Sequence, residues 1–370
     1  MNKILLSTMG AIAIAFGGMA MAPSAAQAGV AVGDDGKLKI GGTVRFRTEY
    51  DKRENSAAPS QTRDRLRLRL RLNGTYQADE NWSLGFRLRT QSDNRHSPHK
   101  TFGLAGSSGS TAFGLDRAYI KYKNDSGLTV WGGKNGVNFW EQTEVFWDAD
   151  YQPEGVAVTY KNSGFTLNAG YFQLSEGNWQ GGAGAVSDVN LFTYQGVYST
   201  KLSGLKYTVG IGGAQATNAV LGDFVSDGAF TAGLQVKGSN WRLGGEFFQG
   251  DGNGSENTGY TIQARYKFSS IGNGLGLRLY YYDIGAHSTP LDGAVTQDNF
   301  PSGNTAPVNF TGYRVQLDYK IASNVSADLR YYYLQAKTTP APALGASALV
   351  GDSISRAGWS RTQLNLNVKF

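Results

Sequence analysis

The sequence predicts an all-β fold, a transmembrane antiparallel barrel of sixteen strands. Three observations carry this prediction. Apolar and polar residues alternate in one segment after another, and the connections between these segments are alternately short and long. After residue 28, no stretch reaches the ~18 uninterrupted apolar residues of a spanning helix. The 50 glycines and 20 tyrosines of the 370-residue chain also argue against a helical protein, which leaves a membrane barrel or a large soluble β-protein.

Residues 1–28 are predicted to be a cleaved signal peptide. Lys3 supplies the positive start, residues 4–21 are apolar and rich in small residues, and Ala26-Gln27-Ala28 fits a small-x-small cleavage site. An anchor helix fits less well because a serine and several glycines interrupt the apolar run. Residues 29–370 are then the outer-membrane barrel, with 34 basic and 29 acidic residues and a net charge of +5. The chain has no cysteine, so this fold forms without disulfides.

Residues 65–72 show the alternation most clearly, because four arginines alternate with four leucines without exception. Side chains alternate across a strand, so the leucines share one face and the arginines the other. Unpaired guanidinium groups cannot enter a packed core. If the arginines faced hydrocarbon, each would cost up to ~2–4 kcal/mol near the bilayer midplane. We therefore expect the leucines to contact lipid and the arginines to line a wet lumen.

The same two-faced pattern recurs along the whole chain. The sixteen predicted strands span residues 38–50, 63–77, 82–92, 114–123, 128–134, 155–161, 165–174, 190–200, 205–214, 229–237, 241–249, 259–268, 275–284, 311–320, 325–334 and 360–370. The long connections cover residues 51–62, 93–113, 135–154, 175–189, 215–228, 250–258, 285–310 and 335–359. Short turns on one rim and long loops on the other are typical of an outer-membrane barrel and not of a soluble sandwich.

Aromatic residues recur where predicted strands meet the short turns. They are Trp82, Tyr122, Phe165, Tyr207, Trp241, Phe268 and Tyr319. Amphipathic rings favour the depth of the lipid headgroups, so these positions predict an interfacial girdle.

The last strand carries a family resemblance. Leu364, Leu366, Val368 and the terminal Phe370 share the lipid side, which resembles the closing strand of bacterial outer-membrane proteins. Residues 146–155 and the strand at 115–122 are similar to segments of a "putative porin" family. The resemblance to Gram-negative porins implies insertion in outer-membrane lipid, recognition of Phe370 by the barrel-assembly machinery, and a homotrimer. It also implies that the third long loop folds into the barrel and makes the constriction.

The residues at that constriction can then be named. The third long loop carries five carboxylates, Glu141, Glu144, Asp148, Asp150 and Glu154, together with three large aromatic residues, Trp140, Phe146 and Trp147. We expect the aromatic side chains to pack on the barrel wall, because leaving them exposed is costly. An exposed acidic surface loop is the alternative. The opposing basic side, called the arginine wall below, consists of Arg45, Arg47, Arg65, Arg67, Arg69, Arg71, Arg87 and Arg89.

Catalysis and cofactor binding have little support in the sequence. The three histidines lie in predicted long loops, and no Ser-His pair or metal-ligand spacing accompanies them, so no enzyme activity, metal or cofactor is expected. Residues 251–256 resemble the start of a calcium loop, but Ile262 replaces its final Glu, so a plain polar turn is favoured. No basic helix or base-stacking motif indicates nucleic-acid binding.

Two functions remain for the pore. A barrel of about sixteen strands leaves an aqueous channel, which fits a passive diffusion porin for ions and small hydrophilic solutes. A solute-specific channel for anionic, phosphorylated or sugar ligands is the alternative, because the inward aromatics Trp131, Phe172, Tyr280, Tyr282 and Tyr332 could stack a sugar. These aromatics are scattered in the sequence, so we favour the general porin. The sign of ion selectivity stays open, because the arginine wall favours anions and the acidic loop favours cations.

Overall fold

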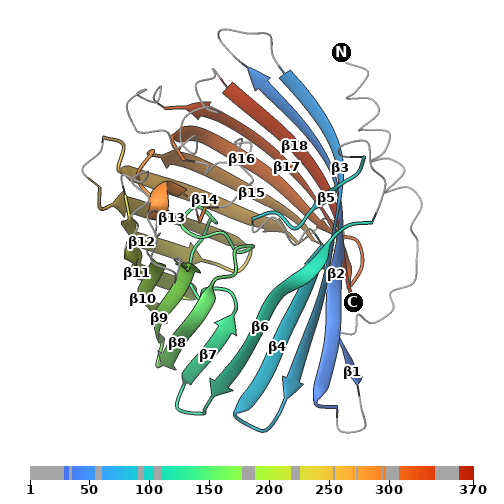
Figure 1. Cartoon of the computed structure of the whole chain (residues 1–370). Coiled ribbons are helices and arrows are strands. Elements are labelled where there is room, and N and C mark those ends of the chain that lie inside the picture. Colours follow the sequence, from blue (N-terminus) through green and yellow to red (C-terminus); the bar gives the residue numbers. More distant parts are fainter. Residues whose placement is uncertain are drawn as a thin grey trace, which may run out of the picture.

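The computed structural model shows a closed antiparallel barrel of sixteen long strands (Figure 1). It describes residues 29–32, 36–54, 61–90, 96–103, 110–176, 188–217, 226–252, 255–269, 271, 274–293, 295–296, 308–337 and 358–370. The predicted signal peptide, residues 1–28, lies outside the described residues. In the part of the chain that is described, no helix is long and apolar enough to cross a membrane.

The sixteen predicted strands are all present. Their bounds are β2 Leu38–Glu54, β3 Gln61–Gln77, β4 Trp82–Thr90, β6 Phe113–Lys123, β7 Leu128–Lys134, β8 Glu154–Asn162, β9 Phe165–Ser175, β10 Val189–Leu202, β11 Leu205–Thr217, β12 Gly228–Lys237, β13 Trp241–Gly250, β14 Thr258–Phe268, β15 Leu275–Ile284, β16 Phe310–Lys320, β17 Val325–Ala336 and β18 Gly358–Lys369. Each strand pairs with its sequence neighbour, and the short turns all lie on one rim.

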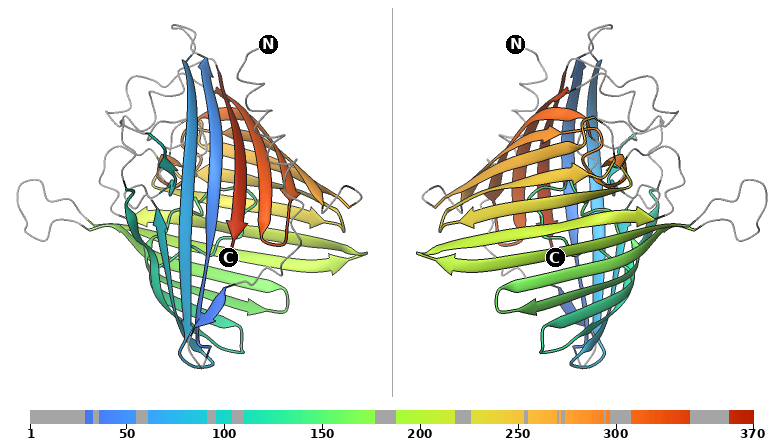
Figure 2. Two further views of the ribbon diagram at one scale, coloured as in Figure 1. Left: turned by 90° about the vertical axis from the view of Figure 1, so that its right-hand side faces the viewer. Right: turned by 90° about the vertical axis from the view of Figure 1, so that its left-hand side faces the viewer.

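The barrel closes where the first long strand meets the last. β18 pairs antiparallel with β2 from Lys369↔Thr43 to Gly358↔Glu54, and Figure 2 shows the two strands side by side. The backbones of Gly42 and Phe370 exchange two hydrogen bonds of 2.7 and 3.0 Å. A Cβ atom on Gly42 would lie 2.5 Å from Cζ of Phe370, so this glycine lets the C-terminal ring close over the seam. Closure leaves no sheet edge exposed to lipid.

Three short elements were not predicted from the sequence. β1 (Val30–Val32) pairs with the start of β2, and the 3-10 helix η2 (Pro290–Gly293) follows β15. β5 (Lys100–Thr101) pairs with β3 next to Arg67. None of them has a hydrophobic period long enough to be read from sequence.

Burial follows the predicted two-faced pattern. On β3, the Leu66 side is open, with 48% of the residue exposed, whereas Arg67 and Arg69 on the other face are each only 8% exposed. The large exposed residues of the other long strands, such as Ile211 and Ile262, likewise share the outer face. The leucines therefore lie outside the barrel and the arginines inside.

An outward charge at mid-strand tests this assignment. Ile211, the seventh of thirteen residues of β11, is 54% exposed on the outer face. We expect Ile211→Arg to destabilise the barrel in a bilayer by about 2–4 kcal/mol, because it places a guanidinium in hydrocarbon. Thr208→Arg is the control, since Thr208 lies on the inner face of the same strand beside a hollow of about 770 Å³. Urea unfolding in lipid vesicles measures both variants, and equal stability would contradict the assignment.

Candidate functional site

Loop 3, residues 135–153 between β7 and β8, crosses the lumen from one wall to the other. Near its start, Asn138 donates to Thr159 of the adjacent strand β8 at 3.0 Å. The amide of Trp140 donates to the Gln195 side chain on β10 at 2.7 Å, and Gln195 returns a 2.8 Å bond to the Trp140 carbonyl. By Gln142, the loop has reached β13. The third long loop is therefore folded into the barrel.

Glu246 of β13 is the main anchor of this loop. Its carboxylate accepts the backbone amides of Gln142 and Thr143 at 2.7 and 3.0 Å, and the Thr143 hydroxyl at 2.7 Å. The side-chain amide of Gln142 adds bonds to the carbonyls of Leu234 and Gly245, at 3.1 and 2.8 Å. Glu246 is 5% exposed, so the bonds to its carboxylate are largely shielded from bulk water. Charge-assisted bonds of this kind are stronger than neutral ones.

Inward glycines make room for the loop. A Cβ on Gly210 of β11 would lie 2.5 Å from the Trp140 ring, and one on Gly233 of β12 would lie 2.9 Å from it. A Cβ on Gly244 of β13 would overlap the Gln142 side chain. Three neighbouring strands thus lack side chains where loop 3 lies. Gly210 also belongs to the Gly-rich run 210–213, which has a packing role here.

The aromatic residues of loop 3 pack as predicted. Phe146 and Trp147 are each 2% exposed. The Phe146 ring stacks on Phe248 of β13 at 6.1 Å, and its edge contacts Phe139 at 5.4 Å. These residues form a hydrophobic cluster inside the lumen, on the side of β13.

On its return, loop 3 meets the arginine wall. Asp150 forms an ion pair with Arg71, and the Asp150 carboxylate lies 3.8 Å from Arg69. Burial raises the pKa of Asp150, but Arg71 and Arg69 outweigh it and hold that pKa well below the usual value. Asp148 accepts from the ring of His96 at 2.8 Å. Asp150 is the loop carboxylate in direct contact with the arginine wall.

The other three predicted carboxylates lie elsewhere. Glu144 is half-buried, and its electrostatic neighbours include Arg330, Arg314 and Arg45. Burial, with Asp150 nearby, raises the pKa of Glu144 to about 7.

Glu141 lies next to the Trp147 amide, at 3.3 Å, and its pKa is raised well above the usual value by burial and by Glu246. Glu154 does not belong to the loop. It begins β8 on the outer face and pairs with Lys134 at 2.8 Å, because the strand alternation turns it away from the lumen.

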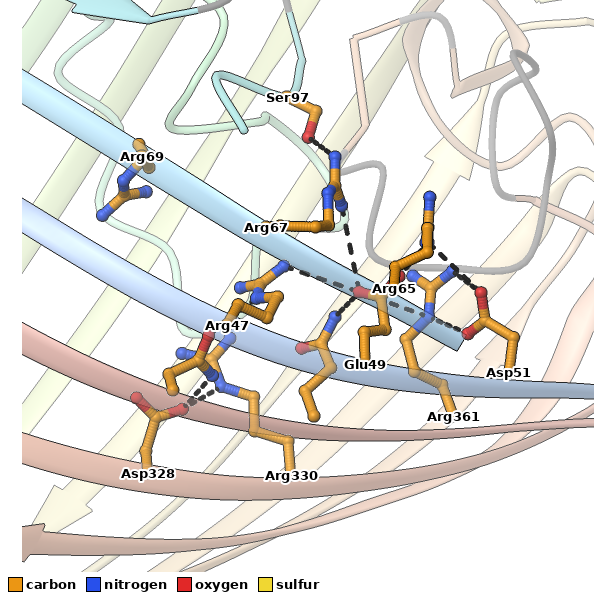
Figure 3. Close-up of polar contacts among 12 residues, drawn as sticks. Arg47, Glu49, Asp51, Arg65, Arg67, Arg69, Ser97, Asp328, Arg330 and Arg361 are labelled. Carbon is orange, nitrogen blue, oxygen red and sulfur yellow. Dashed lines mark hydrogen bonds and ion pairs between the residues drawn. The ribbon is translucent and has the colours of Figure 1, made fainter. Parts of the chain in front are cut away.

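The arginine wall carries its own carboxylates, which sequence analysis missed. Figure 3 shows Arg47, Arg65, Arg67 and Arg361 gathered around Glu49 and Asp51. Glu49 is 1% exposed. It follows Arg47 by two residues on β2, so both side chains share the inner face, and this spacing was the signal that could have identified Glu49. Much of the wall is therefore internally neutralised.

The remaining wall arginines differ in their partners. Arg87 and Arg89 both pair with Asp116 of β6, the latter at 3.1 Å. Arg45, in contrast, bonds to the neutral Asn367 at 2.6 Å and lies directly opposite Arg69 across the β2–β3 ladder. Among the described residues, no carboxylate lies within ion-pair distance of Arg45. Like charges placed opposite one another repel, so this pair is the least neutralised part of the wall.

A second segment, residues 96–99, also enters the lumen just before β5 rejoins the barrel wall. Ser97 accepts from Arg67 at 2.9 Å, and the Pro98 carbonyl accepts from Thr90 at 2.6 Å. His99 is 5% exposed, and burial together with Arg47, Arg67 and Arg69 lowers its pKa well below the usual value, so it is neutral. The sequence placed His96 and His99 in a predicted long loop. The path of a loop has no periodicity, so nothing in the sequence revealed that this one enters the lumen.

Inward aromatics cluster on β15–β17, although they are scattered in sequence. The Tyr280 and Tyr282 rings stack at 6.1 Å, and the Arg314 guanidinium lies 3.7 Å from the Tyr280 centroid. The centroid of the Tyr332 ring lies 5.6 Å from the same Arg314 guanidinium. Both Tyr282 and Tyr332 are at most 1% exposed, so they support Arg314 and do not offer a face to a solute. Within the described residues, no group of three or more metal-ligating side chains was found.

Comparison with known proteins agrees with this geometry. Residues 33–202 match the family model described as "Putative porin". The fold matches a variant of the Rh. blastica porin, with 15% identity, 90% of this chain and 100% of that one covered, and a TM-score of 0.53. The chain has a porin barrel. A search of curated protein sequences finds no match.

Two further structures extend the likeness. OprB of Pseudomonas putida matches with 13% identity, covering 90% of this chain and 94% of that one, with a TM-score of 0.57. An anion-selective porin from Comamonas acidovorans matches with 15% identity, 90% and 99% coverage and a TM-score of 0.55. The family match and the porin barrel together support an outer-membrane channel for small solutes.

The anchoring role of Glu246 can be tested in this barrel. We expect Glu246→Ala to release loop 3, because it leaves two buried amides without acceptors, at about 1–3 kcal/mol each. Single-channel conductance should become larger and noisier, while heat-modifiable migration on gels shows that the barrel still forms. Glu246→Gln keeps one acceptor oxygen and should be intermediate. Unchanged, quiet conductance in the alanine variant would show that the loop is held by other contacts.

Glu144 predicts a pH dependence. Its pKa of about 7 means that the side chain is largely charged at pH 8 and largely protonated at pH 6. Lowering the pH therefore removes a negative charge from the lumen, and anion selectivity should rise as pH falls through 7. Reversal potentials in a KCl gradient measure this shift. Glu144→Gln should have at pH 8 the ion selectivity that the native protein has at pH 6. If the variant keeps the full pH dependence, another group is responsible for that dependence.

Proposed function

We propose that this protein is a general diffusion porin with a preference for small hydrophilic anions. The charge balance around the constriction carries the proposal. Asp150, Glu144 and Asp328 face a larger set of arginines, Arg45, Arg69, Arg71, Arg314 and Arg330. Because Glu144 is partly protonated at neutral pH, the excess is positive. Charges at a narrow, low-dielectric opening determine which ions enter it.

The carboxylates of loop 3 and the arginines of the wall also create a transverse field. Polar solutes can align in such a field, whereas apolar solutes must displace ordered water. From this arrangement we expect solutes to permeate according to their size and polarity, without a saturable binding site for sugars. The buried Tyr280–Tyr282–Tyr332 cluster gives no support to a sugar-stacking path, although a solute-specific channel for anions stays open as the alternative.

Export and assembly complete the proposal. Residues 1–28 direct the chain to the outer membrane and are removed, Phe370 serves as the signal for the barrel-assembly machinery, and the mature porin is a homotrimer. The Gly42–Phe370 seam supports the role of the last residue, because the C-terminal aromatic participates in barrel closure.

Ion selectivity tests the proposed constriction. In a KCl gradient, we expect the native porin to favour chloride. Asp150→Asn should increase that preference, because it frees Arg69 and Arg71. The double variant Arg45→Gln/Arg69→Gln should shift permeability toward potassium by about fivefold or more, since ~1 kcal/mol at the narrowest point changes an ion ratio by that factor. If both variants assemble and leave the reversal potential unchanged, the constriction lies elsewhere.

A further inference from the structure

A second set of basic side chains runs across the half of the barrel beside the short turns. In cross-strand register, each member pairs directly with the next: Lys201, Lys206, Lys237, Arg242, Arg265, Arg278, Gln316 and Arg330. We call these residues the basic row. All lie on the lumen-facing phase of their strands, because their sequence neighbours Leu243, Tyr266 and Leu279 are exposed on the outer face. The row extends over eight consecutive strands, β10 to β17.

The row rises from the short-turn rim toward the constriction. Lys237 is the last residue of β12, next to its turn, whereas Arg330 is the sixth residue of β17. The pairing direction is perpendicular to the strands, and the strands of a barrel are tilted, so a register row climbs around the lumen. At its upper end, Arg330 lines a hollow of about 350 Å³ together with Arg45 and Arg69. The row therefore connects the rim to the arginine wall.

Few carboxylates neutralise the row. Arg278 pairs with Asp318 at 2.5 Å, and Arg330 pairs with Asp328 at 2.6 Å. Among the residues that the structure describes, no acidic side chain lies within ion-pair distance of the first five members. Like charges directly opposite one another destabilise a sheet. A row of like charges therefore destabilises the sheet unless water and anions lie between the side chains.

The geometry suits oxyanions. Neighbouring strands are about 4.8 Å apart, so Arg242, Arg265 and Arg278 present adjacent guanidinium groups on three strands. Arg265 and Arg278 also line a hollow of about 450 Å³. Guanidinium groups bind tetrahedral oxyanions through paired hydrogen bonds, whereas the lysines at the rim act as hydrated point charges that attract ions.

We propose that the basic row is a binding track for small divalent oxyanions, inorganic phosphate or phosphate monoesters, between the constriction and the short-turn mouth. The proposal rests on the proposed porin function, since the track needs a conducting, water-filled lumen. A divalent ion gains from two guanidinium groups at once, so it should reside on the track longer than chloride. The site would therefore retard and concentrate such anions and not simply admit them.

Block of chloride current tests the track. In single channels at low ionic strength, where screening is weak, inorganic phosphate at pH 8 is added to each side in turn, with acetate as a monovalent comparison and glycerol phosphate as the monoester. We expect saturable block by phosphate from the short-turn side and none by acetate. In Arg242→Gln/Arg265→Gln, block should weaken about tenfold, the factor that one lost charge-assisted bond of ~1.5 kcal/mol produces.

The matched control is Lys267→Gln/Lys320→Gln. It removes the same number of positive charges, both from the lining of the 450 Å³ hollow to which Arg265 also belongs, but leaves the row intact, so block should weaken less than about twofold. Equal weakening in the two double variants, or no phosphate block of a native channel that conducts chloride, would overturn the track while leaving the porin function in place. A native barrel that carries no ionic current at all would instead overturn the proposed function.

Discussion

The constraint on which this structure depends is that every strand borders lipid on one face, so charged residues in the lipid-embedded part of a strand must turn inward. In hydrocarbon, backbone groups have no partner except another strand, which forces the closed barrel. The alternation then collects most of the charge in one lumen. At residues 65–71, four arginines enter the lumen within a single strand. The interior must hold these charges without a packed core, and its remaining features follow from that requirement.

The lumen meets this requirement in two ways. Carboxylates and amides on β2, β6 and β18 match arginines of the wall and the neighbouring Arg361, as Asp51 does Arg361 at 2.5 Å and Asn365 does Arg47 at 2.6 Å. Elsewhere, loop 3 brings carboxylates across the barrel to arginines that the wall does not neutralise. A buried charge without a partner is far more costly than one with a partner, so loop 3 stabilises the wall as well as narrowing the pore.

The sequence predicted the periodic parts of this molecule and missed the parts that depend on tertiary pairing. Period two identified sixteen strands and the inward phase of Arg67, whereas the infolded aromatics of loop 3 were expected from the family resemblance and from the cost of exposing large rings. Glu49 shares the inward period of its predicted strand but was not recognised among the arginines, and Asp51 fell in the predicted connection 51–62. The contact of Asp150 with Arg69 and Arg71 agrees with the expected opposition, whereas Glu154 faces outward because it begins a strand. The inward path of residues 96–99 has no local signal.

Register explains why cross-strand features escape a linear reading. Lys201 and Arg278 are far apart in sequence, yet five consecutive pairings place them in one row. A shift of one residue in any strand would turn that strand's charges toward lipid, so lipid fixes the phase of the row. A shift of two would keep the phase and break the row while costing little lipid energy. The membrane alone therefore does not impose this alignment of basic side chains, and the short hairpin turns, which fix strand register, are needed as well.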